Sequence, residues 1–231
     1  DSLNLMRRMQ RLGTIEHFLL FFRGGIADAD PHQEAIELGF REWKGSVVFG
    51  RILSGDDHAA AGAYGVLTEP ATLTLQRLLP GPIERIWDFL TQSELRRQWL
   101  AAGDMTMEPG SPFELVWRND ELSDPPGNKP DGFGEEHRMQ STITECDPPH
   151  RIAFTWNGSG DVSIDLAQQG EQVLLTLVHR QLPNRNTLLM VSAGWHAHLD
   201  ILVTRVEGGS PARFWETWVS LKEDYDRRLP G

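Results

Sequence analysis

The sequence is poor in cysteine and in long hydrophobic runs. Cys146 is the single cysteine among 231 residues, so the chain can form no internal disulfide and offers no cysteine pair for zinc. The most apolar stretch near its start, residues 18–22, is far too short to span a bilayer and precedes no small-residue cleavage site. We therefore predict a reducing, cytoplasmic location, without export or membrane insertion.

Basic residues are also scarce. The chain has 22 Lys and Arg against 33 Asp and Glu, which gives a formal net charge of -11 and a sequence pI of about 5.1. Attraction to phosphate supplies most of the non-specific affinity for nucleic acids, and basic clusters likewise hold proteins on anionic lipid. The charge therefore argues against nucleic acid and membrane as partners.

Catalytic and metal-binding signatures are missing as well. The sequence contains no Gly-rich phosphate loop, no nucleophile elbow, no paired zinc histidines and no thiol–histidine signature. Asp120, Glu121 and Asp124 lie in a Pro/Gly-rich loop, but they lack the alternating ligands and the terminal Glu of a calcium loop. We accordingly predict no cofactor, no metal site and no catalytic residue, and we favour a protein that is not an enzyme.

The sequence does contain enough apolar residues for a packed core, with 39% hydrophobic residues and eight Trp. Small and polar residues without a sustained period fill residues 54–70, which we predict to be a linker. Before it, residues 1–53 are a predicted N-terminal β-α-β extension, with its elements at 15–22, 31–44 and 47–53. Residues 14–53 weakly resemble the start of YCII-related domains, small ferredoxin-like modules that usually dimerise. That resemblance implies a homodimer as one alternative.

Residues 71–231 form the predicted main domain. Polar and apolar residues alternate at 72–78, which is typical of a half-buried strand, and two short helices are expected after Pro82 and Ser93. Short turns separate the later strand-like runs, so we expect an antiparallel meander. These runs lie at 113–118, 135–145, 151–156, 162–166 and 172–179.

Two helices are expected after the strands. Between residues 187 and 207, apolar side chains recur at spacings of three and four and form one stripe that must face the sheet. The stripe consists of Leu188, Val191, Trp195, Leu199, Leu202 and Val206. Gly208 and Gly209 end this helix, and a second one is predicted to begin at Ser210 and Pro211. This order of elements indicates an α+β fold.

Six motifs follow one another in this region: Pro82-x-x-Arg85-x-Trp87-x-x-Leu90-Thr91, Arg97-x-Trp99-Leu100, Glu145-x-Asp147-Pro148-Pro149, Phe154-Thr155-Trp156, Leu175-Thr176-Leu177-Val178-His179 and Gly194-Trp195-His196-x-His198-Leu199-Asp200. In this order they resemble the SRPBCC superfamily and, within it, the heat-shock-protein ATPase activator family. The resemblance implies the helix-grip (START-like, birch-pollen-allergen-like) fold, in which a curved antiparallel sheet surrounds a long C-terminal helix and a deep pocket. It does not imply one activity, because this fold hosts lipid carriers, hormone receptors, cyclases and dehydratases. The family's co-chaperones carry a separate chaperone-binding domain, which nothing before Thr72 resembles.

The implied pocket would be lined by aromatic side chains and a few polar groups. On a helical projection, Trp195 lies at the centre of the stripe and His198 about 60° to one side, where a neutral imidazole could hydrogen-bond a ligand or relay a proton. His196 projects elsewhere and is expected to form a surface contact with Asp200. We predict that the residues in contact with a ligand are Trp195, His198, Trp117, Met139, Trp156 and His137.

Three functional hypotheses follow. We favour a non-catalytic domain that binds an apolar small molecule between the sheet and the C-terminal helix. The alternatives are a cyclase or dehydratase that uses a pocket histidine, and a regulator of a chaperone ATPase that acts through protein contacts. Both pocket hypotheses require a cavity larger than a few water molecules.

Overall fold

The computed structural model describes residues 42–43, 46–47, 63–156 and 160–229. The chain divides into two compact units, residues 1–55 and 56–231. In the first unit, β1 (Glu42–Trp43) and β2 (Ser46–Val47) pair in antiparallel. The predicted helix 31–44 is therefore wrong at its C-terminal end, which lies in β1. The remainder of that helix, the strand at 15–22 and most of the YCII-like stretch 14–53 lie outside the described residues.

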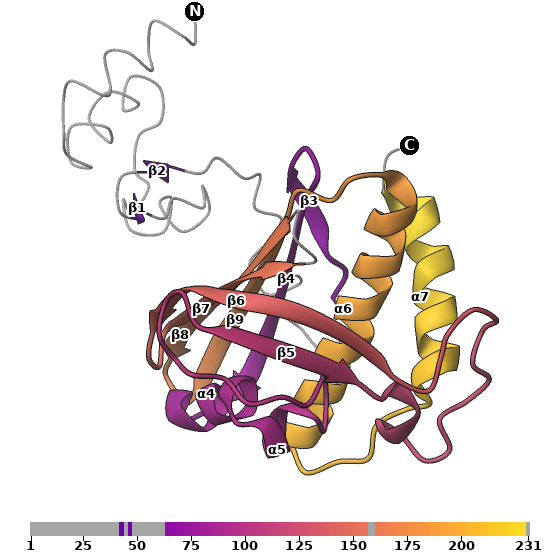
Figure 1. Cartoon of the computed structure of the whole chain (residues 1–231), viewed down its shortest axis with the longest axis horizontal. Helices are drawn as coiled ribbons and strands as arrows, with labels where there is room; N and C mark the ends of the chain where they lie inside the picture. The colour runs from indigo at the N-terminus through magenta and orange to yellow at the C-terminus, as the bar shows by residue number, and fades with distance from the viewer. Residues whose placement is uncertain (1–41, 44–45, 48–62, 157–159, 230–231) are drawn as a thin grey trace, which may run out of the picture. The chain divides into compact units, whose positions relative to one another are not determined.

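The second unit is built on a seven-stranded antiparallel sheet in the order β3-β4-β9-β8-β7-β6-β5. Five strands, from β5 to β9, run side by side in sequence order, as short turns between them require. The strands are β3 (Val66–Glu69), β4 (Thr72–Pro80), β5 (Pro112–Trp117), β6 (His137–Asp147), β7 (Arg151–Trp156), β8 (Gly160–Gln169) and β9 (Gln172–Arg180). The sheet curves around helix α6 (Arg185–Val206), which confirms the predicted helix-grip fold (Figure 1).

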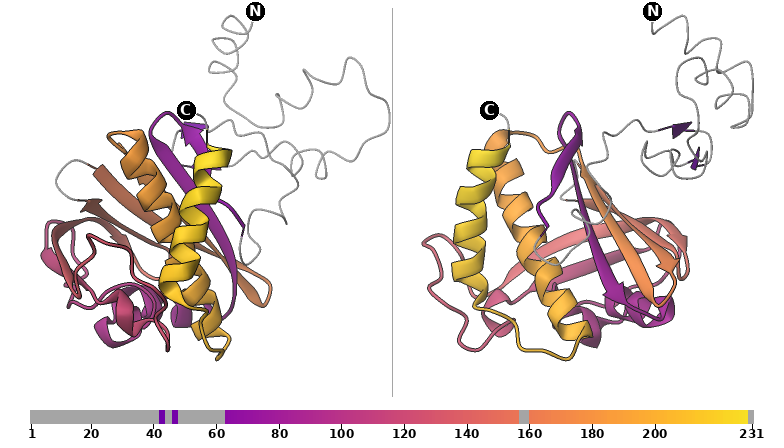
Figure 2. Two further views of the ribbon diagram at one scale, coloured as in Figure 1. Left: turned by 90° about the vertical axis from the view of Figure 1, so that its right-hand side faces the viewer. Right: turned by 180° about the vertical axis from the view of Figure 1, so that it is seen from behind.

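Helix α6 is buried on two sides. The predicted stripe faces the sheet and is buried throughout, apart from the partly buried Val191. Helix α7 (Phe214–Arg228) packs along the side of α6 that faces away from the sheet (Figure 2). Leu189, Ala193 and Val203 are consequently buried as well, although they lie outside the stripe.

The start of α7 differs from the prediction. The helix begins at Phe214 and not at Ser210, because its first amides find their acceptors in the loop after β5. The Phe214 N–H donates to Ser123 Oγ at 3.0 Å, and the Trp215 N–H donates to the Pro126 carbonyl oxygen at 3.1 Å. A distant loop therefore sets this helix terminus.

Two short helices cover the end of the helix-grip fold at which the C-terminus of α6 lies. They are α4 (Ile83–Thr91) and α5 (Ser93–Arg96), and the 3-10 turn η1 (Asn119–Glu121) follows after β5. Arg85 Nη2 donates to the Val206 carbonyl oxygen at 2.6 Å, which ties α4 to the end of α6. The predicted cap of α5, Ser93, is instead its first helical residue, and its Oγ accepts the Gly103 N–H at 2.9 Å.

The described part of the predicted linker 54–70 belongs to the sheet. Strand β3 pairs with β4, and the Gly65 N–H donates to Tyr225 Oη at 2.8 Å. The sheet therefore begins before residue 71, whereas the boundary between the domains stays a prediction.

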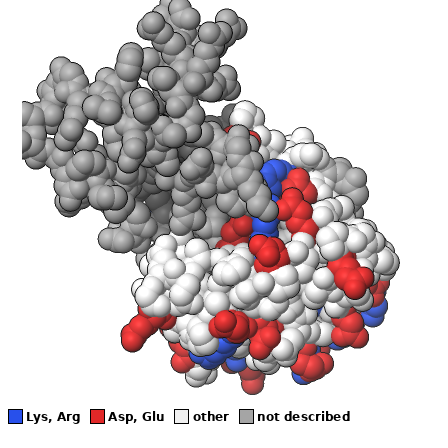
Figure 3. Space-filling model, turned by 90° about the vertical axis from the view of Figure 1, so that its left-hand side faces the viewer, with Lys and Arg blue, Asp and Glu red and all other residues white. Residues whose placement is uncertain are grey.

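Two surface properties bear on partners. Acidic side chains are spread over the face shown in Figure 3, with basic ones between them and no basic patch among the described residues of that face. No helix in the described ranges combines the length and apolarity needed to cross a membrane.

Candidate functional site

An aromatic cluster lies between the sheet and the N-terminal half of α6. We define it as Trp117 of β5, His137 of β6, Trp156 of β7, His179 of β9 and Trp195 of α6. Trp156 is at its centre, with ring centroids 5.7 Å from Trp117, 5.0 Å from His179 and 5.3 Å from Trp195. The antiparallel register places His137 opposite Trp117, and their rings are 5.5 Å apart. Trp156 is half-buried and His137 exposed, so the cluster connects the interior to the surface.

His179 is the one member that we did not predict. It appears in the sequence only as the last residue of a motif, although its alternation with Leu177 and Leu175 places it on the inner face of β9. Trp195 Nε1–H donates to His179 Nδ1 at 3.1 Å. Because an indole nitrogen only donates, the proton of the neutral His179 ring is on Nε2. Burial lowers the pKa of His179 to about 4.

The structure brings together four of the six predicted ligand-binding residues: Trp195, Trp117, Trp156 and His137. Met139 is buried on the same face of β6, directly opposite Leu115. It therefore lies deeper along the same inner wall.

His198 lies elsewhere. Its Nδ1 is 2.7 Å from the Trp99 carbonyl oxygen, to which it donates, and its ring centroid is 5.0 Å from that of Phe214. Burial lowers the pKa of His198 to about 4. The flank of α6 that carries this residue is covered by α7 and by the chain after α5, a contact that helical spacing does not reveal. The geometry thus separates His198 from the aromatic cluster.

The predicted contact of His196 with Asp200 is present, but its predicted place at the surface is wrong, because His196 is only 1% exposed. Its Nε2 is 3.2 Å from Asp200 Oδ2, its Nδ1 is 3.0 Å from Tyr225 Oη, and Arg77 Nε donates to Asp200 Oδ1 at 3.0 Å. We call Arg77, His196, Asp200 and Tyr225 the Arg77 network. Burial alone would raise the pKa of Asp200, but the hydrogen bond from His196 and the charge of Arg77 hold it below its usual value. Arg77 lies on the inner face of the sheet, so α6 must present polar side chains opposite its guanidinium.

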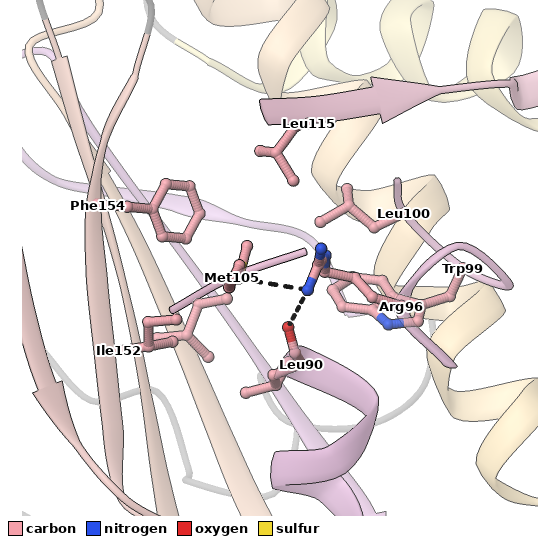
Figure 4. Close-up of a pocket in the computed structure, with 9 residues that line it drawn as sticks. Leu90, Arg96, Trp99, Leu100, Met105, Leu115, Ile152 and Phe154 are labelled. Carbon is pink, nitrogen blue, oxygen red and sulfur yellow. Dashed lines mark hydrogen bonds between the residues drawn. The ribbon is translucent and has the colours of Figure 1, made fainter. Parts of the chain in front are cut away.

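A small cavity lies next to the aromatic cluster, towards α4 and α5 (Figure 4). Its volume is about 10 Å³, which is the space for about one water molecule. Phe154 belongs to its wall and also contacts Trp156, at a centroid distance of 6.4 Å. The lining residues are Leu90, Arg96, Trp99, Leu100, Met105, Leu115, Ile152, Phe154 and Ile164. Arg96 is the only charged residue among them.

A groove on the outside of the same unit is much larger, at about 340 Å³. It lies where α6 and α7 meet the Pro/Gly-rich loop, which Lys129 and Trp215 hold in place through hydrogen bonds to Asp120 of 2.7 and 2.6 Å. The groove is lined by Pro130, Leu189, Trp218, Val219, Lys222, Glu223 and Asp226. Neither this groove nor any other part of the described chain holds a cluster of three His, Cys, Asp or Glu that could bind a metal.

Comparison with known proteins identifies the family. Residues 80–207 match the family model of activator of Hsp90 ATPase homolog 1-like proteins. No curated protein matches the chain. The solution structure of a Bordetella parapertussis protein encoded by gene BPP1335 is 34% identical, with a TM-score of 0.63, and the match covers 76% of this chain and 95% of that one.

Two more distant structures share the fold alone. CalU16 from Micromonospora echinospora is 19% identical, with a TM-score of 0.50, over 68% of this chain and 86% of that one. The conserved protein EF2215 from Enterococcus faecalis, of unknown function, is 17% identical, with a TM-score of 0.51, over 70% and 90% of the two chains. The family model covers residues 80–207 and confirms the resemblance of the six motifs. The chain therefore belongs to the activator of Hsp90 ATPase homolog 1-like family.

Proposed function

We propose that the chain is a non-catalytic binding domain that takes an apolar small molecule between the sheet and α6, at the aromatic cluster. The observation that carries this proposal is the cluster itself, which brings three Trp and two His together from five elements. Ligand sites are mostly apolar and aromatic, with few polar groups. The partial exposure of Trp156 gives such a ligand a place of entry.

The small volume of the cavity determines how binding must occur. The cavity of about 10 Å³ is smaller than a few water molecules, so the prediction of a preformed deep pocket is wrong. Small-molecule pockets begin at roughly 300 Å³, so the ligand must separate rings that are now in contact. Each aromatic contact contributes about 0.5–1.5 kcal/mol beyond its buried area. Burial of about 200 Å² of apolar ligand surface contributes about 5 kcal/mol, which exceeds the loss of two such contacts. Association itself costs at least about 4 kcal/mol, so a ligand that opens the cluster must bury more than about 300 Å² of apolar surface.

The histidines favour binding over proton transfer. His198, one of the two histidines that the sequence offers to a cyclase or dehydratase, donates to the Trp99 carbonyl oxygen away from the cluster. His137, the other, lies at the exposed edge of the cluster against Trp117. His179 faces the cluster, but its Nδ1 already accepts the hydrogen bond of Trp195. A general base needs an imidazole nitrogen within reach of a substrate proton, and these contacts occupy the basic nitrogen of His179.

Trp156→Gln is expected to weaken binding of N-phenyl-1-naphthylamine, a neutral apolar probe, by about 10-fold. The substitution replaces the central ring of the cluster with a smaller polar amide, so it removes apolar contact with the probe and places a polar group where the probe would bind. Probe fluorescence measured against protein concentration gives the dissociation constant. Trp87→Gln on α4, a Trp outside the cluster, is the control and should bind as the unmodified chain does. The proposal fails if the unmodified chain shows no saturable binding, or if both variants bind equally well.

A second candidate is regulation of a chaperone ATPase, which the outer groove favours. Its floor of Leu189, Trp218 and Val219 is apolar, and Val219 is 36% exposed. The description of the matched family names Hsp90 as the chaperone. If this function holds, the chain stimulates ATP hydrolysis by Hsp90 and Val219→Glu abolishes the stimulation, while binding of N-phenyl-1-naphthylamine stays unchanged. A coupled ATPase assay that shows no stimulation by the unmodified chain rejects it.

A further inference from the structure

We propose that Arg96 is an anion site in the wall of the grip, and that the ligand is an apolar molecule with a carboxylate group. The inference rests on the proposed function, since it names the class of molecule that the aromatic cluster accepts. Its basis is a buried cation beside an apolar cavity.

Arg96 is buried without a carboxylate partner. The residue is 1% exposed, and no Asp or Glu in the described part of the chain lies within 4.0 Å of its guanidinium. The charge of Asp104 acts on Arg96 from the surface, where that carboxylate is exposed. Arginines are almost never fully buried unless they are paired. Burial lowers the pKa of Arg96 to about 10, which still leaves it charged at neutral pH.

The local hydrogen bonds account for only part of the guanidinium. Nη1 donates to the carbonyl oxygens of Leu90 and Thr91, at 3.3 and 2.8 Å, and so caps the end of α4. Nη2 donates to the carbonyl oxygen of Gly103. Gly103 is required here, because its φ is +128° and a Cβ would lie 1.9 Å from the Glu114 carbonyl oxygen. These acceptors are all neutral, so they hold the side chain without balancing its charge.

Arg96 Nε is the guanidinium nitrogen that none of these acceptors satisfies. It is buried and has no hydrogen-bond partner among the residues that the structure describes. Buried donors without an acceptor are rare, and each one calls for an explanation. The guanidinium belongs to the wall of the cavity, whose other lining side chains are apolar (Figure 4). An oxygen supplied from outside the chain is therefore the acceptor that this donor lacks.

The cavity and its surroundings match a carboxylate with an apolar body. About 10 Å³ admits one water-sized group, which is the size of a carboxylate oxygen. Phe154 separates the cavity from Trp156, so a ligand with its carboxylate at Arg96 would extend into the aromatic cluster. Met105 also lines the cavity, is only partly buried and accepts from Nη1 at 3.3 Å through its weakly accepting sulfur. A carboxylate oxygen would replace this contact with a charge-assisted hydrogen bond.

A matched pair of probes tests the inference. The probes are 11-(dansylamino)undecanoic acid, which is ionised at pH 7.5, and its methyl ester, which has the same apolar body without the charge. We expect the unmodified chain to bind the acid about 10- to 100-fold more tightly than the ester, as one charge-assisted hydrogen bond requires. Arg96→Met should abolish this preference and retain ester binding. Arg97→Met is the control, since the neighbouring Arg97 side chain is 50% exposed, and it should retain the preference.

The outcomes separate the two proposals. If the ester binds the unmodified chain as tightly as the acid does, Arg96 holds at most a water molecule and the inference is wrong, while the binding function stands. If neither probe binds, the proposed function is wrong and the inference falls with it. Because acid and ester are compared on the unmodified chain, this decision stands even if Arg96→Met does not fold. Arg96→Lys, which keeps the charge and shortens the reach, should retain part of the preference for the acid.

Discussion

Between pH 6.5 and pH 4 the main domain is expected to lose about 5 kcal/mol of its free energy of unfolding. The cause is two buried neutral histidines, His179 and His198, whose pKa values burial lowers from 6.5 to about 4. Between these pH values the unfolded chain binds protons that the folded chain does not bind. The contribution of the histidines to the free energy of unfolding is therefore present above pH 6.5 and is lost as the pH falls. Over its whole titration each histidine contributes about 3 kcal/mol, at 1.36 kcal/mol per pKa unit, and most of this is lost between these pH values. Since whole domains are stable by only about 5–15 kcal/mol, the domain should unfold near the lower end of this range.

Both sites show why the charged ring is disfavoured. A proton on His179 Nδ1 would face Trp195 Nε1–H, so two donors would point at each other. His198 already donates from Nδ1 to the Trp99 carbonyl oxygen, and a second proton would place its charge in a buried site beside the ring of Phe214. Asp200 has a pKa held below 3.8, so its contribution to stability is lost only below this window. The hydrogen bonds from Arg138 and Arg118 lower the pKa of Glu136 from 4.5, a value inside the window, so a variant without the two histidines is needed to separate their effect from carboxylate protonation.

Urea unfolding at pH 7, 6, 5 and 4 measures the loss. The double variant His179→Asn/His198→Asn is the control, because Asn offers an oxygen to Trp195 or an amide N–H to Trp99 and does not titrate. Its free energy of unfolding should change little across the window. Equal pH dependence in the unmodified chain and the double variant would show that the two histidines are not responsible.

The pattern of the sequence predicts the elements better than their ends. The alternation in β4 and the stripe on α6 depend on contacts with the sheet, which recur along the whole length of each element, so both were predicted correctly. The start of α7 depends instead on Ser123 and Pro126, which lie about ninety residues earlier in the chain. A cap of this kind leaves no local signal, and the local motif Ser210-Pro211 therefore predicts the wrong start.

Burial of polar residues was the main source of error in the site. Helical projection assigned His198 to the pocket and His196 to the surface, because it assumed a helix covered on one side only. Helix α7 covers the second side, which buries both residues and gives His196 its contact with Tyr225. Likewise, the sequence does not tell which of the neighbouring residues Arg96 and Arg97 is buried, and in the structure only Arg96 is. The structure brings four of the predicted residues together, because the apolar faces of adjacent strands must meet the stripe of α6.

Asp200→Ala is expected to lower the free energy of unfolding by about 3–5 kcal/mol, because it leaves the buried Arg77 guanidinium without its carboxylate. Arg77 is 0% exposed and lies on the inner face of β4, so its charge cannot turn to solvent. Arg77→Met alone should cost less, since the Asp200 side chain is 30% exposed and can be hydrated.

The double variant Arg77→Met/Asp200→Leu decides whether the loss comes from an unpaired charge or from the pair itself. Burying an ion pair removes two charges from water, so apolar residues of similar size are often as stable as the pair that they replace. The double variant should therefore recover most of the stability that Asp200→Ala loses, as measured by urea unfolding at pH 7. Asp226→Ala, which breaks the exposed pair with Arg185, should change stability little. If the double variant is as unstable as Asp200→Ala, the stability of the Arg77 network comes from its hydrogen bonds to His196 and Tyr225 rather than from charge balance.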